Sequence, residues 1–341
     1  MAERIRLGLA GYGAIGRQHA AAARAVPGVD LVAVAEPSGA GPDGVPVHPD
    51  LGPMLDAGGL DGVILATPTA QHVDGALDCV DRGLPVLVEK PVGATADEAR
   101  RLVETAEAAG VPVLVGHHRR HNPLIHAAKD AIARGAIGRV RAVQSTCWFY
   151  KPDPYFAAAP WRTKPGGGPI AQNLVHDIDL LRHLVGEIAA VQATLRPAVR
   201  GFEVEDIAAA VLEFADGAIG TVTVSDAVAA PWSWELTSGE NRAYPDVPES
   251  CYLIGGSEGS LSVPDLRLWR HEDGPDWMTP IGATSLITGR AEPLVAQIAN
   301  FADVIRGRAE PVAPGREGLK TIEVLEAIRA SAAGGGRVAV G

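Results

Sequence analysis

The chain has 341 residues, of which 47% are hydrophobic and 21% charged, a composition typical of a folded globular protein rather than a disordered or fibrous one. A chain of this length is expected to form about two domains. Its net charge of −11 offers no basic face for a phosphate backbone, so we expect no nucleic-acid partner.

The sequence carries no pattern of membrane insertion or export. It contains no run of roughly 18 or more apolar residues, and it passes from Met1 directly into a strand pattern without an apolar signal region. Cys79, Cys147 and Cys251 lie far apart and form no C-x-x-C pair. We therefore expect a cytoplasmic protein with reduced thiols and no membrane partner.

The first third of the chain alternates short apolar runs with helical patterns. Strands are expected at 5–10, 31–36, 62–67, 86–90 and 111–117. The segment 37–61 contains five prolines, so only VPVH and PMLDAG remain as traces of a strand and a helix. Buried strands joined by helical crossovers predict a doubly wound parallel sheet of the α/β class.

The order of the predicted elements changes after residue 119, where predicted strands begin to follow one another directly. A long strand over 139–150 lies between two predicted helices, several shorter strands follow, and two helices close the chain. This pattern predicts a separate α+β domain at 120–341, built on an open-faced, mostly antiparallel sheet. Its last helix can pack back on the first domain, residues 1–119.

The first strand-to-helix turn reads Gly11-Tyr12-Gly13-Ala14-Ile15-Gly16, a G-x-G-x-x-G pattern. Its glycines allow a tight turn, close approach of a pyrophosphate and close packing of helix on strand. Glu36 lies 20 residues beyond Gly16, where a carboxylate can bind the ribose hydroxyls. Residues 1–119 are therefore predicted to be a Rossmann domain that binds NAD. NADP remains possible because Ser38 and its loop could accommodate a phosphate.

Four motifs in order carry a resemblance to a known family. They are GLAGYGAIGRQHA, ATPTAQH, the triplet Glu89-Lys90-Pro91, and GGGPIAQNLVHDIDLLRHL at 166–184. From Gly8 to about Ala339 the chain resembles the Gfo/Idh/MocA oxidoreductases. The resemblance implies hydride transfer between a nicotinamide and a hydroxyl-bearing carbon of a sugar, cyclitol or related ring. It also implies a homodimer or homotetramer formed through the C-terminal sheet.

The resemblance extends the cofactor site beyond the glycine loop. It assigns cofactor contacts to Thr67, Pro68, His72, Glu89, Lys90, Trp161 and Arg162. From the residues alone, the Thr/Pro turn could simply cap a helix, His72 could face solvent, and Trp161 could be a packing residue. Glu89 and Lys90 end the apolar run VLVEK, and a packing role alone does not explain them, because an isolated buried charge is costly. The resemblance also leads us to expect a cis peptide before Pro91.

His176 and Lys90 are the predicted catalytic residues. Histidine carries protons near neutral pH, and the resemblance places Lys90 beside the reacting oxygen. Where the family has an Asp, four residues before this histidine, the chain has Gln172, which cannot ionise. Either Lys90 and His176 suffice as a dyad, Gln172 and Asn173 shape a different substrate pocket, or the chemistry has been altered.

Further substrate contacts are predicted on both domains. Asp179 shares a helical face with His176, although a helix carboxylate can also only fix a neighbour. His117 and Arg119, in the run that leaves the last Rossmann strand, are candidate substrate contacts, with a solvated basic linker as the alternative. Arg119, Arg120 and Arg162 could hold a carboxylate. The histidines of this run lack a carboxylate that would complete a metal site, so no metal is expected.

The motifs together predict an NAD(P)-dependent dehydrogenase that acts on CH–OH groups of a sugar, cyclitol, sugar acid or related ring polyol. Two alternatives stay open. Some relatives use NAD transiently to cleave a glycosidic bond, and a dehydrogenase-like body can serve as a non-catalytic dinucleotide sensor. Lys90 and His176 together argue against a sensor, whereas Gln172 argues weakly for one.

Overall fold

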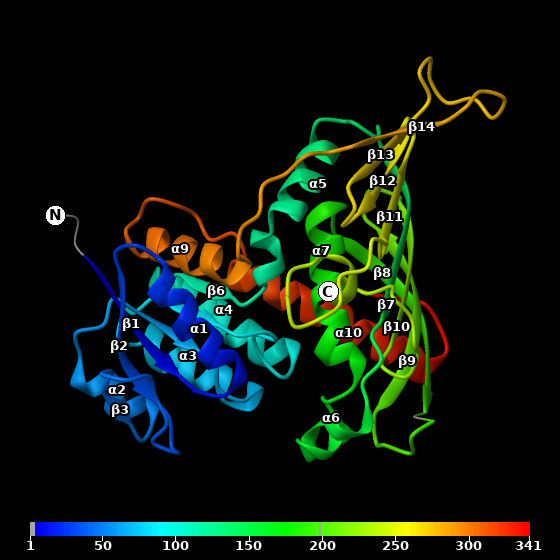
Figure 1. The fold of residues 1–341 in the computed structure, drawn as a ribbon. Helices are drawn as coiled ribbons and strands as arrows, with labels where there is room; N and C mark the ends of the chain where they lie inside the picture. The colour runs from blue at the N-terminus through cyan, green and yellow to red at the C-terminus, as the bar shows by residue number, and fades with distance from the viewer. Residues whose placement is uncertain (1–3, 198) are drawn as a thin grey trace. The chain divides into compact units, whose positions relative to one another are not determined.

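The computed structural model describes residues 4–197 and 199–341, so the first three residues of the predicted Rossmann domain lie outside the described part. The chain divides into two compact units (Figure 1). The first holds the chain up to Asn122 together with Ala291–Ile322, and the second holds Pro123–Arg290 and Glu323–Gly341.

The first unit is built on a six-stranded sheet in the order β3-β2-β1-β4-β5-β6, with every pairing parallel. Its strands are β1 Ile5–Ala10, β2 Val29–Ala35, β3 Val47–His48, β4 Gly62–Leu65, β5 Val86–Val88 and β6 Val113–Val115. This order confirms the predicted doubly wound parallel sheet. The short strand and the short helix predicted within 37–61 are both present, as β3 and as α2 Leu51–Ala57.

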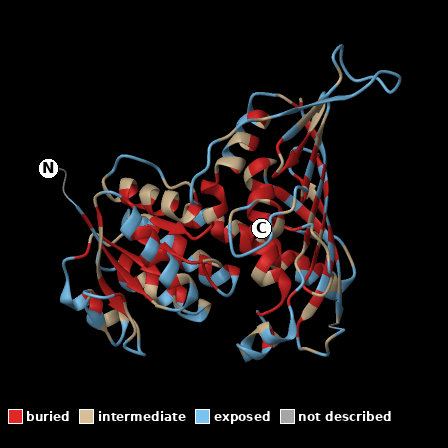
Figure 2. Cartoon of the chain, viewed as in Figure 1, coloured by how far each residue is buried: buried red, intermediate tan, exposed pale blue. Residues whose placement is uncertain are grey.

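Helices cover both faces of this sheet. Alternate strand residues point to opposite sides, so Val63 packs toward α2, α3 His72–Val80 and α4 Ala96–Ala109, whereas Ile64 packs toward α1 Ala14–Ala25 and α9 Pro293–Ile305. Figure 2 shows the strands buried between these helices. The parallel sheet therefore leaves its strand ends, rather than its faces, for ligands.

Residues 291–322 group with the first unit, which differs from the expected division at residues 119 and 120. Three residues of α9 are fully buried in the apolar layer shared with α1: Ile298, Phe301 and Ala302. Figure 1 shows α9, in orange, beside α1. Helix α10 Gly315–Gly334 begins in the first unit and ends in the second. A return of the last helix was expected, but the return of α9 was not, because both closing helices follow the strands of the second sheet in the sequence.

The second unit contains a nine-stranded sheet in the order β14-β13-β12-β11-β7-β10-β9-β8-β15. The pairing of β7 with β10 is parallel and the other described pairings are antiparallel, which confirms a mostly antiparallel sheet. Its strands are β7 Val140–Trp148, β8 Ile188–Pro197, β9 Glu205–Phe214, β10 Ile219–Ser225, β11 Tyr252–Gly256, β12 Gly259–Val263, β13 Arg267–Arg270, β14 Gly282–Ser285 and β15 Val338–Ala339. The short strands β14 and β15 were not predicted.

One face of this second sheet is covered and the other is open. Helices α5 Pro123–Ala133 and α7 Val175–Leu184, with the end of α10, pack on the covered face. Along β9 and β10 buried residues alternate with more exposed ones (Figure 2). Val211, Ile219 and Leu253 remain 41%, 56% and 50% exposed. No helix within the described ranges combines the length and the apolarity that crossing a membrane requires.

Candidate functional site

The glycine loop between β1 and α1 has the geometry that its spacing predicts. Gly11 has a φ of +87°, and a Cβ there would lie 2.4 Å from the backbone oxygen of Ala66. A Cβ on Gly16 would lie 2.1 Å from the oxygen of Gly11. A Cβ on Gly13 would meet open space, and Gly13 begins α1 without a side-chain cap. The loop therefore leaves room and free helix amides for a phosphate.

Glu36 follows β2 directly and turns back onto this loop. Its Oε2 accepts a hydrogen bond of 2.8 Å from the backbone N–H of Tyr12, and its Oε1 accepts one of 2.7 Å from the Ser38 hydroxyl. These donors, with the N–H of Ser38, hold the pKa of Glu36 below its usual range. The side chain is an ionised acceptor beside the loop. Its Oε1 already accepts from both the hydroxyl and the N–H of Ser38, so the lone pair that remains for a ribose hydroxyl is on Oε2.

The segment after β4 adds an unsatisfied polar atom. The hydroxyl of Thr67 is buried and has no hydrogen-bond partner among the described residues. Thr67 also adjoins the glycine loop, since a Cβ on Gly11 would lie 3.0 Å from its backbone nitrogen. Pro68, the next residue, is exposed. A buried orphan hydroxyl, an open Gly13 and an ionised Glu36 on one sheet edge fit a dinucleotide.

His72 is not a solvent-facing residue. It is fully buried at the start of α3, with Nδ1 2.8 Å from the oxygen of Pro91 and Nε2 2.8 Å from the oxygen of Thr67. The imidazole therefore joins the loop after β4 to the loop after β5. A direct contact between His72 and the cofactor stays a prediction.

Glu89 and Lys90 end β5 at the same edge of the sheet. Glu89 is buried, and its Oε1 lies 2.7 Å from Nε2 of His19 in α1. Its Oε2 accepts a hydrogen bond of 3.1 Å from the backbone N–H of Lys90. The Lys90–Pro91 peptide is cis, as expected. We call Gly11, Glu36, Thr67, Glu89 and Lys90 the strand-end site.

The basic run after β6 is not a solvated linker, so that alternative is wrong. His117, Arg119 and Arg120 are all buried, the two arginines within a short 3-10 helix, η2 His118–His121. Arg120 forms an ion pair of 2.9 Å with Glu317, so its charge is compensated within the first unit. The substrate contacts of His117 and Arg119 stay predictions. Among the described residues no group of three or more His, Cys, Asp or Glu side chains is placed to hold a metal.

His176 lies in the second unit, in the first turn of α7, and is 7% exposed. The helix is entered through a π-helical turn, Ile170–Leu174, which we call the π-turn. Asp179, one turn after His176, is buried as well. Because π-helical turns occur often at functional sites, this entry marks the segment independently of its histidine.

Gln172 and Asn173 are adjacent in the π-turn but point into different surroundings. Gln172 is partly exposed and its Nε2 donates to the oxygen of Gly166 at 3.1 Å. Asn173 is buried, its Oδ1 accepts from Nζ of Lys151 at 2.6 Å, and its Nδ2 donates to Oε1 of Glu235 at 3.0 Å. Asn173 thus bridges a buried ammonium and a carboxylate.

Lys151 follows β7 and is 4% exposed. Burial lowers the pKa of its ammonium group, and the charges of Asp226 and Glu235 oppose that effect. The ammonium also lies 5.2 Å from the ring centroid of Tyr155. A buried cation is thus held one hydrogen bond away from the π-turn that leads into His176.

Trp161 and Arg162 form part of a short 3-10 helix, η3 Pro160–Thr163. The Trp161 side chain is 53% exposed, which does not fit a core packing residue. The guanidinium of Arg162 stacks 3.8 Å from the ring centroid of Tyr155 and donates to the oxygen of the same residue at 2.6 Å. A cofactor contact from either residue stays a prediction.

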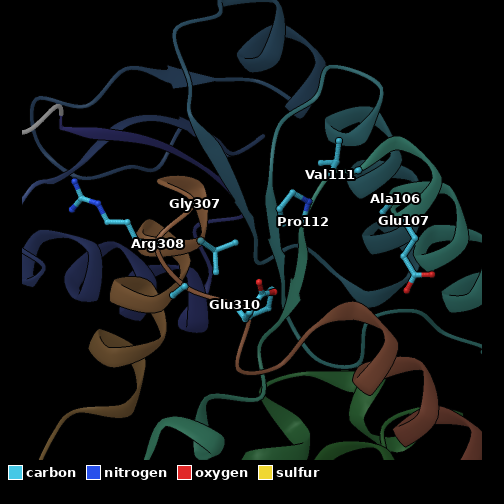
Figure 3. Close-up of a pocket in the computed structure, with 11 residues that line it drawn as sticks. Ala106, Glu107, Val111, Pro112, Gly307, Arg308 and Glu310 are labelled. Carbon is cyan, nitrogen blue, oxygen red and sulfur yellow. The ribbon is translucent and has the colours of Figure 1, made fainter.

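A separate hollow lies at the opposite edge of the first sheet, near the amino ends of its strands. Its volume is about 540 Å³, and Figure 3 shows Glu107, Pro112 and Arg308 around it. No residue predicted to act on cofactor or substrate lines it. The hollow is therefore distinct from the strand-end site.

Sequence reasoning missed three polar residues, of which His19 and Lys151 are buried and Glu235 is partly buried. His19 could have been noticed, because it lies one turn after Gly16 on the buried side of α1. Lys151 and Glu235 gave no such signal, since both stand in Pro- and Trp-rich segments and meet Asn173 only through the tertiary fold.

Comparison with known proteins gives matches over most of the chain. Residues 5–117 match a family model described as an oxidoreductase family with an NAD-binding Rossmann fold. Residues 125–262 match the GFO/IDH/MocA C-terminal domain.

Individual relatives agree with these models. The chain is 35% identical over 232 residues to the rhizopine catabolism protein MocA of Rhizobium meliloti, covering 65% of this chain and 71% of the relative. It is 27% identical to inositol 2-dehydrogenase of Rhizobium meliloti, covering 95% of each chain. It also resembles the WlbA dehydrogenase of Bordetella pertussis, solved with NADH and UDP-GlcNAcA, with a TM-score of 0.80, 29% identity and 99% of both chains covered.

Proposed function

The chain belongs to the Gfo/Idh/MocA oxidoreductase family, and on this premise we propose that it transfers a hydride between NAD and a carbon bearing a secondary hydroxyl or ketone. The substrate is a sugar, cyclitol, sugar acid or related ring polyol. The first unit binds the dinucleotide, and the second supplies substrate contacts and the subunit interface. The observation that carries the proposal is Lys90, anchored through Glu89 at the sheet edge that also holds the glycine loop.

The protein's own groups have defined tasks in this proposal. The free amides at the start of α1 bind the pyrophosphate, Glu36 accepts from the ribose hydroxyls, and the Thr67 hydroxyl gains the partner it lacks. When bound, the nicotinamide supplies the hydride acceptor. Because Glu36 is ionised beside the ribose position, it repels a 2′-phosphate, and we propose NAD rather than NADP as the preferred cofactor.

Lys90 and His176 carry the proton chemistry. The ammonium of Lys90 binds the reacting oxygen and stabilises the charge that develops there, while His176 takes the hydroxyl proton. Gln172 cannot share that proton, so the pair works without a carboxylate at this position. His117, Arg119, Gln172, Asn173 and Asp179 shape the substrate side, with Asn173 held in place by Lys151 and Glu235.

The substrate class follows from the named relatives, since one is an inositol dehydrogenase and another was solved with a sugar-acid nucleotide. We place the protein in the cytoplasm, where its three buried thiols stay reduced. The open face of the second sheet supports self-association, because it exposes Val211, Ile219 and Leu253. A hollow of about 470 Å³ on this unit is lined by Trp148, Trp232 and Trp269 and adds to that surface.

The test is to follow reduced-nicotinamide absorbance while NAD or NADP is offered with sugars, inositols, sugar acids and dihydrodiols. We expect a signal with one ring class, stronger with NAD, and a loss of about 10²–10⁴-fold in turnover for His176→Ala. Tight copurifying NAD with glycoside cleavage and no net redox would instead indicate the glycosidase alternative. Dinucleotide binding with neither activity would favour the sensor.

A further inference from the structure

Three elements of the first unit converge on the carboxylate of Glu89. Helix α1 brings His19, which is fully buried, to 2.7 Å from Oε1, and the end of β5 places the Lys90 N–H 3.1 Å from Oε2. The segment after β6 contributes Gly116, where a Cβ would lie 2.7 Å from Oε1. The close approach of Gly116 therefore leaves no room for a side chain at that position and restricts where the carboxylate can lie.

The pair formed by His19 and Glu89 is electrostatically unusual for a buried site. Burial by itself would raise the pKa of Glu89, yet the hydrogen bond from His19 and the nearby charges of His19, His118 and Lys90 lower it to about 2. Glu89 is thus a carboxylate throughout the neutral range. A buried charge needs dedicated partners to offset its desolvation, and here Lys90 is among the charges that stabilise the carboxylate.

From this convergence we infer that Glu89, held by His19, is a positioning residue that sets the direction and the charge state of Lys90. The inference rests on the proposed function of Lys90 in the reaction. The electrostatic interaction between two groups acts equally on both, so a carboxylate that is stabilised by Lys90 stabilises the ammonium form of Lys90 in return. The Lys90 backbone is fixed at the same time through its N–H.

The arrangement also ties Lys90 to the cofactor loop. His19 stands six residues after Gly13 on α1, the helix whose first amides face the phosphate position. A single buried contact between side chains therefore joins the phosphate-binding helix to the strand end that carries Lys90. The distance between bound cofactor and Lys90 is then set inside one unit.

The first test compares His19→Leu with His19→Gln. A leucine leaves Oε1 of the buried carboxylate without the donor from His19, whereas the glutamine amide can donate from nearly the position of Nε2. We expect His19→Leu to lower kcat about 10- to 100-fold with the Kd for NAD changed less than about twofold, and His19→Gln to restore most of the rate. Equal rates in wild type and His19→Leu would overturn the inference.

The second test uses Glu89→Gln, which keeps the shape and an acceptor for Lys90 but removes the charge. Without the carboxylate the ammonium form of Lys90 is less favoured, so the alkaline limb of kcat against pH should move by about one unit toward lower pH. A loss of packing alone cannot produce this shift. Leu102→Ala, a cavity variant on the other sheet face, is the matched control and should lower Tm while leaving the pH profile in place.

A third variant, Lys90→Ala, distinguishes a failure of the proposed function from a failure of the inference about Glu89. If Lys90→Ala turns over at the wild-type rate, the proposed role of Lys90 is wrong and the inference falls with it. If Lys90→Ala is inactive while Glu89→Gln keeps the wild-type pH profile, the proposed function stands and the inference is overturned. A shifted profile in Glu89→Gln, with an inactive Lys90→Ala, supports both.

Discussion

The strand-end site and the π-turn obtain their order in different ways. At the strand-end site backbone groups provide most of the order. The φ of Gly11 sets the turn of the loop, and the N–H groups of Tyr12 and Lys90 bind the carboxylates of Glu36 and Glu89. In the π-turn the side chain of Asn173 is fixed by the side chains of Lys151 and Glu235. Backbone donors remain when a side chain is replaced, whereas the order of the π-turn is lost or altered when either of these two side chains changes.

The largest effect on cofactor binding is expected from Gly11→Ala. The Cβ would be forced to 2.4 Å from the Ala66 oxygen at a φ of +87°, so the loop must deform. We expect the affinity for NAD to fall at least about 100-fold, measured by fluorescence titration. Gly52→Ala, in α2 with open space around its Cβ, is the matched control and should bind normally. Normal binding by Gly11→Ala would show that the tight turn at Gly11 is not needed for the cofactor.

Asn173→Ala should have the next largest effect and tests the long-range order of the π-turn. Removing the bridging amide leaves Lys151 and Glu235 without their common partner, which should cost about 1–3 kcal/mol in unfolding free energy and about 10-fold or more in kcat. Gln172→Ala, at the partly exposed neighbour, should change kcat less than about threefold. The reverse ranking in steady-state kinetics would assign the critical amide to Gln172.

Glu36→Gln should change cofactor preference by a smaller factor. The amide removes the negative charge that opposes a 2′-phosphate while it keeps an acceptor for the Tyr12 N–H. We expect the ratio of kcat/KM for NAD over NADP to fall roughly 10-fold, equivalent to about 1.4 kcal/mol. An unchanged ratio would mean that Glu36 does not face the ribose.

A separate effect, on stability rather than on activity, is expected in acid. The pKa of Glu89 is about 2 in the folded protein against an ordinary value of 4.5, so its contribution is complete above 4.5 and is lost as the pH falls toward 2. Urea unfolding across this window should show a shallower acid loss for Glu89→Gln than for wild type. Parallel curves would mean that the carboxylate is not held ionised by its neighbours.

Association through the open sheet gives an independent check on the second unit. Leu253→Lys places a charge on an exposed apolar position of β11. Sedimentation should show the wild type as a dimer or tetramer and the variant shifted toward the monomer. A wild-type monomer would contradict the proposed interface.

Much of the first unit could be predicted from sequence because its signals are local. The glycine spacing, Glu36 after β2 and the apolar runs each follow from a short segment, and the parallel sheet follows from their alternation. The strand-end residues Glu89 and Lys90 were equally visible as charges that end an apolar strand.

The remainder could not be predicted because it depends on tertiary contacts. The return of residues 291–322 to the first unit rests on the packing of α9 against the layer around α1. The burial of Arg120 rests on Glu317, and the role of Lys151 rests on Asn173. In each case neither a periodic pattern nor a motif in the sequence identifies the partner residue.

The most direct measurement is the fate of the carbon-bound hydrogen. The protein is incubated with NAD and ring polyols deuterated at their carbinol carbons, and the nicotinamide is then examined by mass spectrometry. We expect NADH carrying deuterium together with the matching ketone, and neither product from Lys90→Ala. Recovery of unlabelled, oxidised NAD from protein that binds it firmly, with every ring carbon still deuterated, would contradict hydride transfer from these ring polyols.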